Sequence, residues 1–314
     1  MQKTSRDGAR MGRKWLPVGG LLLLSLLWAM GWVRADLSPG AGAGLKLSPL
    51  WREAVLLGVF AGLATAAGAI LRRRWPTGNA DVRTLLTGFG LFVVPSVLSV
   101  LLQGRIDDTS RVAWFSLTPL FAVIFAPHLG MAGEREVRGG FSGAMAAVAG
   151  TFLVFPVELP HSYGSAFALL GVLLAAASVA AANCLAVEIV QSQNVCPLPF
   201  AAITTGAASI LLGIAGLMAI HRSFSPLPFD AWAISDFLAL VLLFWLMREM
   251  SAVQMTTRFL IAPLLANLIS IALLRPHLEI QAWIGLLLIA AGAGWMLFAP
   301  SDVASESNPG ILLR

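Results

Sequence analysis

The chain contains two similar apolar strings, TPLFA at residues 118–122 and APLLA at residues 262–266, which lie 144 residues apart. Each string opens a hydrophobic stretch, and each proline is followed 31 residues later by a glycine, Gly150 in the first copy and Gly294 in the second. Five predicted membrane crossings separate the two copies. An odd number of crossings turns the second copy upside down relative to the first, so the pattern predicts two inverted structural repeats.

The composition is that of a polytopic membrane protein. Of the 314 residues, 58% are hydrophobic and only 12% are charged, and the mean hydropathy is +0.82. Soluble domains carry about 25% charged residues. The apolar residues also fall into blocks near the length of about 20 residues that a helix needs to cross a bilayer. A net charge of +5 would suggest a nucleic-acid partner in a soluble chain, but these basic residues lie between the apolar blocks and indicate membrane orientation.

The hydropathy pattern predicts an all-α integral membrane protein with ten transmembrane helices arranged as two inverted five-helix repeats. All spans must be helical because hydrocarbon offers free backbone groups no partner. The first repeat is predicted at residues 1–157, the second at 165–299, and a polar tail at 300–314. The predicted spans are 15–33, 54–71, 84–103, 112–129, 140–157, 165–187, 199–220, 231–247, 259–274 and 281–299.

The distribution of basic residues predicts that both termini are cytoplasmic. With the N-terminus inside, 14 of the 21 lysines and arginines fall in inside segments, including the cluster Arg72–Arg74. The alternative is a cleaved secretory signal, because a basic start precedes Leu21–Leu24. The nearest small-x-small site, residues 41–43, lies well beyond the apolar run, and cleavage would break the repeat, so an uncleaved first span is favoured.

Further residues around the two prolines make the sequence resemble the EamA-type repeat. The first copy is carried by the segment 107–113, the TPLF string, Gly133-Glu134 and the glycines from Gly143 to Gly150. The second is carried by 250–253, Pro263-Leu264, Trp283, Gly285 and Gly294. Two such repeats make the drug/metabolite transporter superfamily. The resemblance implies a ten-helix carrier with both termini cytoplasmic, and it carries little information on the substrate.

Two positions depart from the family pattern. The acidic residue expected after the fourth span is matched by Glu134 or Glu136, whereas Arg275-Pro276 occupies the corresponding place in the second half. The arginine that members often carry inside span 2 lies just ahead of that span here, as Arg52. Assignment to a characterised subfamily therefore does not follow from the sequence.

Polar and aromatic residues in the predicted spans are candidates for lining a solute cavity. Arg111, Glu188 and Arg258 lie near span ends, where snorkelling to the interface is the favoured interpretation. Asn183 and Asn267 lie deeper and are expected to hydrogen-bond either a solute or a neighbouring helix. The full set of cavity candidates is Trp28, Trp32, Arg111, Phe115, Asn183, Glu188, Gln254, Arg258 and Asn267.

The prolines are candidates of another kind. A proline removes a backbone donor and disturbs the preceding helical turn, so Pro119 and Pro263 are either flexing points of two equivalent helices or static kinks. The charges beside them differ, because Arg111 lies eight residues before its proline and Arg258 five before its own. The repeat therefore predicts that the two halves have the same backbone arrangement. The solute is expected to be bound by residues that differ between the halves.

No catalytic signature was found, and the four histidines are dispersed, so neither an enzyme, a cofactor nor a metal site is predicted. The resemblance implies a secondary active transporter of the inner membrane that moves an amino acid-like or drug-like metabolite, with export as the default direction. An ion or counter-solute gradient would supply the energy. The expected partners are the lipid bilayer and the solute, a homodimer is left open, and no nucleic acid is expected. The alternatives are a non-transporting membrane partner or lipid flippase component and, less favoured, a membrane enzyme acting on lipid-linked substrates.

Overall fold

The fold was analysed on a computed structural model that describes residues 15–30, 49–76, 79–129, 134–155, 157, 160–193, 195–219, 231–274 and 279–298. These residues form helices joined by short connections, and no β-sheet occurs among them. The first helix covers Trp15–Met30. The others are α2 (Pro49–Ile70), α3 (Asn79–Gly88), η2 (Phe89–Val93), α4 (Val94–Leu101), α5 (Asp108–Phe115), α6 (Thr118–His128), α7 (Glu134–Val154), α8 (Tyr163–Ser192), α9 (Pro197–Ala219), α10 (Ala231–Glu249), α11 (Ala252–Thr256), α12 (Arg258–Leu274) and α13 (Ile280–Phe298).

Within the described residues, seven helical segments are long and apolar enough to cross a membrane. Three of them join consecutive elements: α3 through α4 (Asp81–Leu101), α5 with α6 (Thr109–His128), and α11 with α12 (Ala252–Leu273). Trp15–Met30 and Gly139–Val154 are shorter apolar helices. The chain is therefore a multi-pass, all-helical membrane protein. The predicted count of ten spans stays a prediction, and the predicted tail at 300–314 lies outside the described residues.

Two of these long segments are broken a few residues before their prolines, at positions that differ between the two copies. Ser116 and Leu117 separate α5 from α6, and Thr257 separates α11 from α12. Pro119 is the second residue of α6, whereas Pro263 lies inside α12. The carbonyl of Phe115, four residues before Pro119, loses its usual backbone donor and instead accepts a hydrogen bond from the Thr118 hydroxyl at 2.6 Å. The proline therefore marks a helix start in the first copy and an interior position in the second.

The broken helices also correct two predicted boundaries. The predicted span 112–129 begins at Thr109, and the predicted span 259–274 begins seven residues earlier, at Ala252. The sequence of α11 is too polar to look membrane-spanning, but its polar groups are paired locally. Ser251 and Gln254 form a reciprocal capping box, and the Thr256 and Thr257 hydroxyls donate to carbonyls three residues back.

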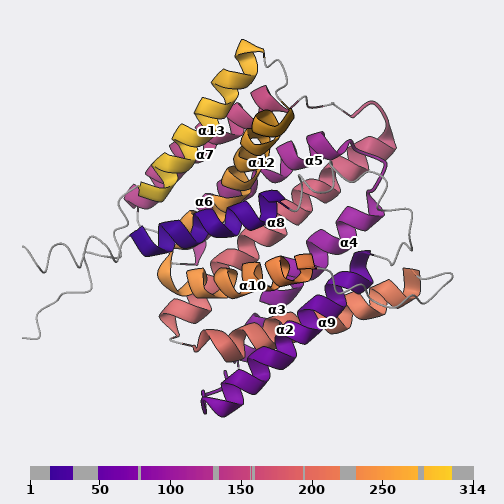
Figure 1. Cartoon of the computed structure of the whole chain (residues 1–314), viewed down its shortest axis with the longest axis vertical. Coiled ribbons are helices and arrows are strands. Elements are labelled where there is room, and N and C mark those ends of the chain that lie inside the picture. Colours follow the sequence, from indigo (N-terminus) through magenta and orange to yellow (C-terminus); the bar gives the residue numbers. More distant parts are fainter. Residues whose placement is uncertain are drawn as a thin grey trace, which may run out of the picture.

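The helices are arranged around α8, the longest, which has 30 residues (Figure 1). At one end of the molecule α7 and α13 lie side by side, and at the other end α2 packs on α9. Between these pairs, α8 packs against α3, α4, α5, α6 and α10. Ser209 on α9 fastens the second pair by donating its hydroxyl to the Ala54 carbonyl at 2.6 Å. The two halves of the sequence are thus interleaved rather than separate bodies.

The contact between α7 and α13 depends on glycine. A β-carbon at Gly150 would lie 2.5 Å from the carbonyl oxygen of Gly285, and one at Gly143 would lie 2.8 Å from that of Gly292. The reverse contacts are equally close, so the two backbones touch directly. The order of the contacts also shows that the helices are antiparallel. Gly294, by contrast, would meet no atom within 4 Å, so the two glycines that follow the prolines at equal spacing have different surroundings.

We predict that Gly292→Ala destabilises the protein and that Gly294→Ala, on the same helix, does not. The first methyl group would collide with the Gly143 carbonyl and lie 2.7 Å from the backbone nitrogen of Ala147. Overpacking of this kind costs about 1–3 kcal/mol. The second would enter open space and gain up to about 1 kcal/mol from helix propensity. Melting temperatures in one detergent would test the pair, and equal values would contradict the close backbone contact.

Candidate functional site

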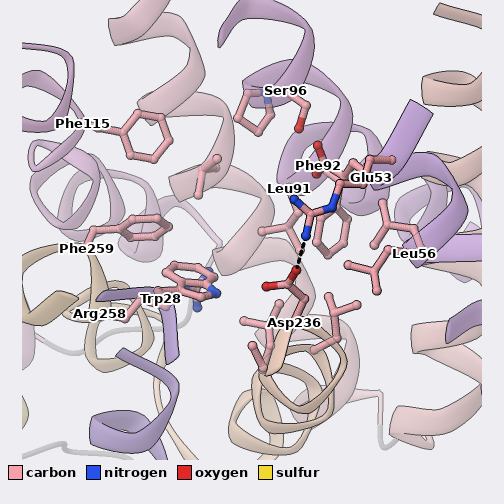
Figure 2. A pocket seen from close by; sticks show the side chains of 17 residues that line it. Trp28, Glu53, Leu56, Leu91, Phe92, Ser96, Phe115, Asp236, Arg258 and Phe259 are labelled. Carbon is pink, nitrogen blue, oxygen red and sulfur yellow. Dashed lines mark ion pairs between the residues drawn. The ribbon is translucent and has the colours of Figure 1, made fainter. Parts of the chain in front are cut away.

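A cavity of about 450 Å³ lies between the helix over Trp15–Met30 and elements α2, η2, α4, α5, α8, α10 and α12. Most of its wall is apolar. Its polar lining residues are Arg52, Glu53, Ser96, Asp236 and Arg258. In Figure 2, Arg258, Trp28 and Phe259 lie together on one side, whereas Glu53 and Asp236 lie on the other. The cavity is of the size that takes a small organic molecule.

Arg258, the first residue of α12, is the most deeply buried charged residue among those the structure describes, with 1% of its surface exposed. Its guanidinium donates from Nη2 to the Oδ1 atom of Asn183 at 3.0 Å and from Nη1 to the Met255 carbonyl at 3.4 Å. Its Nε has no hydrogen-bond partner among the described residues. The expected snorkelling to the interface is therefore wrong, because this side chain is buried and its guanidinium contacts Asn183, Met255 and two aromatic rings.

Aromatic rings surround the Arg258 guanidinium. Its central carbon lies 4.7 Å from the ring centroid of Phe259 and 5.1 Å from that of Trp28. Both are distances at which a cation is attracted to the ring face. Phe259 also contacts Trp28, with ring centroids 5.7 Å apart, and Phe115, with centroids 5.5 Å apart. One wall of the cavity thus combines a buried cation with three aromatic rings.

Phe115 and Phe259 occupy equivalent positions, since each lies four residues before the proline of its string. Their rings meet nearly edge to face, with an interplanar angle of 64°. Such a pairing contributes about 0.5–1.5 kcal/mol beyond burial. The two helical segments that carry the proline strings therefore meet at the cavity wall, through Phe115 and Phe259.

The opposite wall carries three charged residues that were not among the sequence candidates. Arg52 of α2 lies 3.7 Å from Asp236 of α10, and the side chains are 56% and 47% exposed. Glu53 lines the same side, next to Ser96 of α4 in the lining (Figure 2). The sequence held a signal for Asp236, because a carboxylate inside an apolar run is expected to face a partner or a wet cavity. Arg52 was noted only as a departure from the family pattern.

The remaining candidates lie away from this cavity. Glu188 pairs with Arg83 of α3, which donates from Nη1 to Oε1 at 3.1 Å. Gln254 caps α11 and donates to the Leu297 carbonyl of α13 at 3.0 Å. Asn267 donates to the carbonyl of Pro263, one turn back, at 2.9 Å. Arg111 lines a neighbouring cavity of about 370 Å³, which shares Glu53 and Ser96 with the first.

Of the nine cavity candidates, the structure brings four together at this wall: Trp28 and Asn183 contact the Arg258 guanidinium, and Phe115 lines the same cavity and packs on Phe259. Trp32 lies outside the described residues. The described residues contain no group of three histidines, cysteines or carboxylates that could hold a metal ion. The site is a cavity with a buried arginine in one wall and two carboxylates and an arginine in the opposite wall.

The EamA-like transporter family matches residues 166–298, which span α8 through α13. This part of the chain is similar to that family. EamA belongs to the drug/metabolite transporter superfamily, so the resemblance stated from the sequence is confirmed. No curated protein matches the sequence. A solved structure entitled "Crystal structure of protein" is similar to this chain, with a TM-score of 0.66 at 15% sequence identity, and the match covers 89% of this chain and 99% of that one. At this identity the likeness concerns the fold alone.

We predict that Asn183→Ala destabilises the protein more than Asn267→Ala. The first change removes a side-chain hydrogen bond to a buried cation, which is worth about 1.5–3 kcal/mol, whereas the second removes one to a neutral carbonyl in the same helix, worth about 1 kcal/mol. Thermal unfolding in detergent would measure both. A larger loss for Asn267→Ala would contradict the role given to the Asn183–Arg258 contact.

Proposed function

We propose that this protein is a secondary active transporter that moves a small organic metabolite across the inner membrane by alternating access. The observation that carries the proposal is the cavity, because its wall combines residues from both halves of the chain. Phe115 and Phe92 come from the first half, and Phe259, Asp236 and Arg258 come from the second. Secondary transporters bind their solutes at such a meeting point of two repeats. The similarity of residues 166–298 to the EamA-like transporter family supports the same activity.

We further propose the ten-span arrangement in two inverted repeats, with both termini cytoplasmic. Supporting this, α7 and α13 are antiparallel partners that touch through reciprocal glycine contacts. The broken segments α5–α6 and α11–α12 also meet through Phe115 and Phe259. The family match, 166–298, lies inside the second proposed repeat.

Reporter fusions test this topology. We expect fluorescent-protein fusions at either terminus to be bright and alkaline phosphatase fusions there to be inactive, since the first folds in the cytoplasm and the second is active outside it. Fusions within the predicted outside loop 104–107 are the control, and there we expect active alkaline phosphatase and a dark fluorescent protein. An active phosphatase at the C-terminus would contradict an even number of spans.

In alternating access, the cavity must close on one side while it opens on the other. The Arg83–Glu188 pair joins α3 to α8 and lies outside the cavity lining. We assign to it the role of holding these helices together in the present conformation. The Arg52–Asp236 pair joins α2 to α10 at the cavity itself, and both side chains are half-exposed. It is therefore placed to separate when those helices move apart.

The solute we propose is an amino acid-like or drug-like molecule, and export is the proposed direction. A cavity of about 450 Å³ with an aromatic wall fits an amphipathic molecule of modest size. Because the sequence has no ATP-binding motif, we propose that an ion or counter-solute gradient supplies the energy.

Transport is testable by counterflow in proteoliposomes with a panel of labelled metabolites. We expect saturable counterflow for at least one member and a loss of about ten-fold or more in its rate for Phe259→Ala. The control is Phe141→Ala, which changes an α7 side chain that is 47% exposed on the outside of the helix bundle. Absence of counterflow across a wide panel would favour a non-transporting membrane partner.

A further inference from the structure

We propose that Arg258 selects the solute by charge, because it pairs with an anionic group, a carboxylate in the simplest case, carried by the solute itself. This inference rests on the proposed transport function. It goes beyond that function by naming the chemical class of the solute and the residue that recognises it. Arg258 lines the cavity, is 1% exposed, and has an Nε atom without a hydrogen-bond partner among the described residues.

The first step of the argument is the missing counter-charge. Within the part of the chain that the structure describes, the ion pairs join Arg52 to Asp236 and Arg83 to Glu188, and none involves Arg258. Its contacts are the Asn183 amide oxygen, the Met255 carbonyl and two aromatic faces. These groups supply partial negative charge but no net charge. A buried cation that keeps its charge without an anion is costly, so such residues within a membrane mark binding sites for charged partners.

The second step is the arrangement of the other groups. Trp28 and Phe259 face the cation, and Phe115 packs on Phe259 in the same wall, whereas the far side of the cavity holds two carboxylates and one guanidinium (Figure 2). That side has a net charge of −1 when all three are ionised. A second anionic group on the solute would meet repulsion there. The cavity is therefore complementary to a molecule with one carboxylate, bound at Arg258, and an apolar or aromatic body against the rings.

The third step concerns specificity. Guanidinium binds carboxylate through parallel hydrogen bonds that an ammonium cannot reproduce. The Asn183 contact fixes one edge of the guanidinium and leaves Nε for another acceptor. A neutral amide of the same shape would leave the buried charge uncompensated, and an amine would add a second positive charge beside it. The preference for the acid over its isosteres is thus a direct consequence of Arg258.

The experiment measures binding of matched probes to the purified full-length protein. The probes are phenylacetate, phenylacetamide and phenethylamine, with the same acid, amide and amine series on indolyl and isobutyl bodies. We expect at least one acid to raise the melting temperature and to bind at least ten-fold more tightly than its amide and amine. Arg258→Gln should abolish this preference and Arg258→Lys should retain part of it. Arg73→Gln, which removes an exposed arginine beyond the end of α2, should leave it unchanged.

Three results would overturn the inference: equal affinity for acid and amide in the native protein, a preference for the acid that survives Arg258→Gln, or no binding of any acid in the three series. The first and third need no variant, so the inference stays testable if Arg258→Gln does not fold. Counterflow of the same probes separates this inference from transport. Acid-selective binding without counterflow contradicts the transport proposal alone, whereas counterflow that ignores charge contradicts the role of Arg258 alone.

Discussion

The architecture depends on how broken helices satisfy their own backbone inside a membrane. Hydrocarbon cannot hydrate a free carbonyl, so every break in a spanning helix needs a local donor. At the first break, Ser116 and Thr118 donate to the carbonyls of Ala113 and Phe115. At the second, Thr256 and Thr257 donate to those of Val253 and Gln254. These four buried hydroxyls each reach back three residues, and they allow the chain to change direction next to the cavity.

The two copies place equivalent residues at the cavity wall, but the side chains beside them differ in chemistry. Phe115 and Phe259 are equivalent and contact each other. Arg258, one residue before Phe259, has Trp114 as its counterpart, and Trp114 packs against Phe152 instead of lining the cavity. The first copy has the indole of Trp114 where the second has the guanidinium of Arg258. Only the second copy therefore supplies a charge at this position. The two halves supply matching backbones, and the binding chemistry comes from what differs between them.

Much of the fold was predictable from the sequence, because length and hydropathy largely define a membrane helix. The proline strings predicted that two helices are equivalent, and the structure adds that these helices meet at the cavity through Phe115 and Phe259. The early start at Ala252 could not be predicted from hydropathy, since Gln254, Thr256 and Thr257 are polar and yet satisfy neighbouring backbone groups. For the same reason Arg258 seemed to lie at an interface, although the structure buries it.

The pairing of the polar residues in the cavity wall could not be predicted from the sequence. Arg52 and Asp236 are 184 residues apart in the sequence and meet only because α2 and α10 pack against each other. The pairing of Glu188 with Arg83 across 105 residues has the same origin. Hydropathy reports which residues are costly in lipid but not which neighbours compensate them. Such neighbours follow from helix packing, which a single sequence does not encode in any local pattern.

The glycine contacts between α7 and α13 bear on the mechanics of the molecule. Because backbone meets backbone at Gly143, Gly150, Gly285 and Gly292, the two helices cannot approach more closely there, and the side chains of Met296 and Val154 pack beside the contact. A slip by one residue would bring the methyl groups of flanking alanines into carbonyl oxygens. We therefore expect the pair to move as one body, with deformation where the backbone is already interrupted, at residues 116–117 and at residue 257.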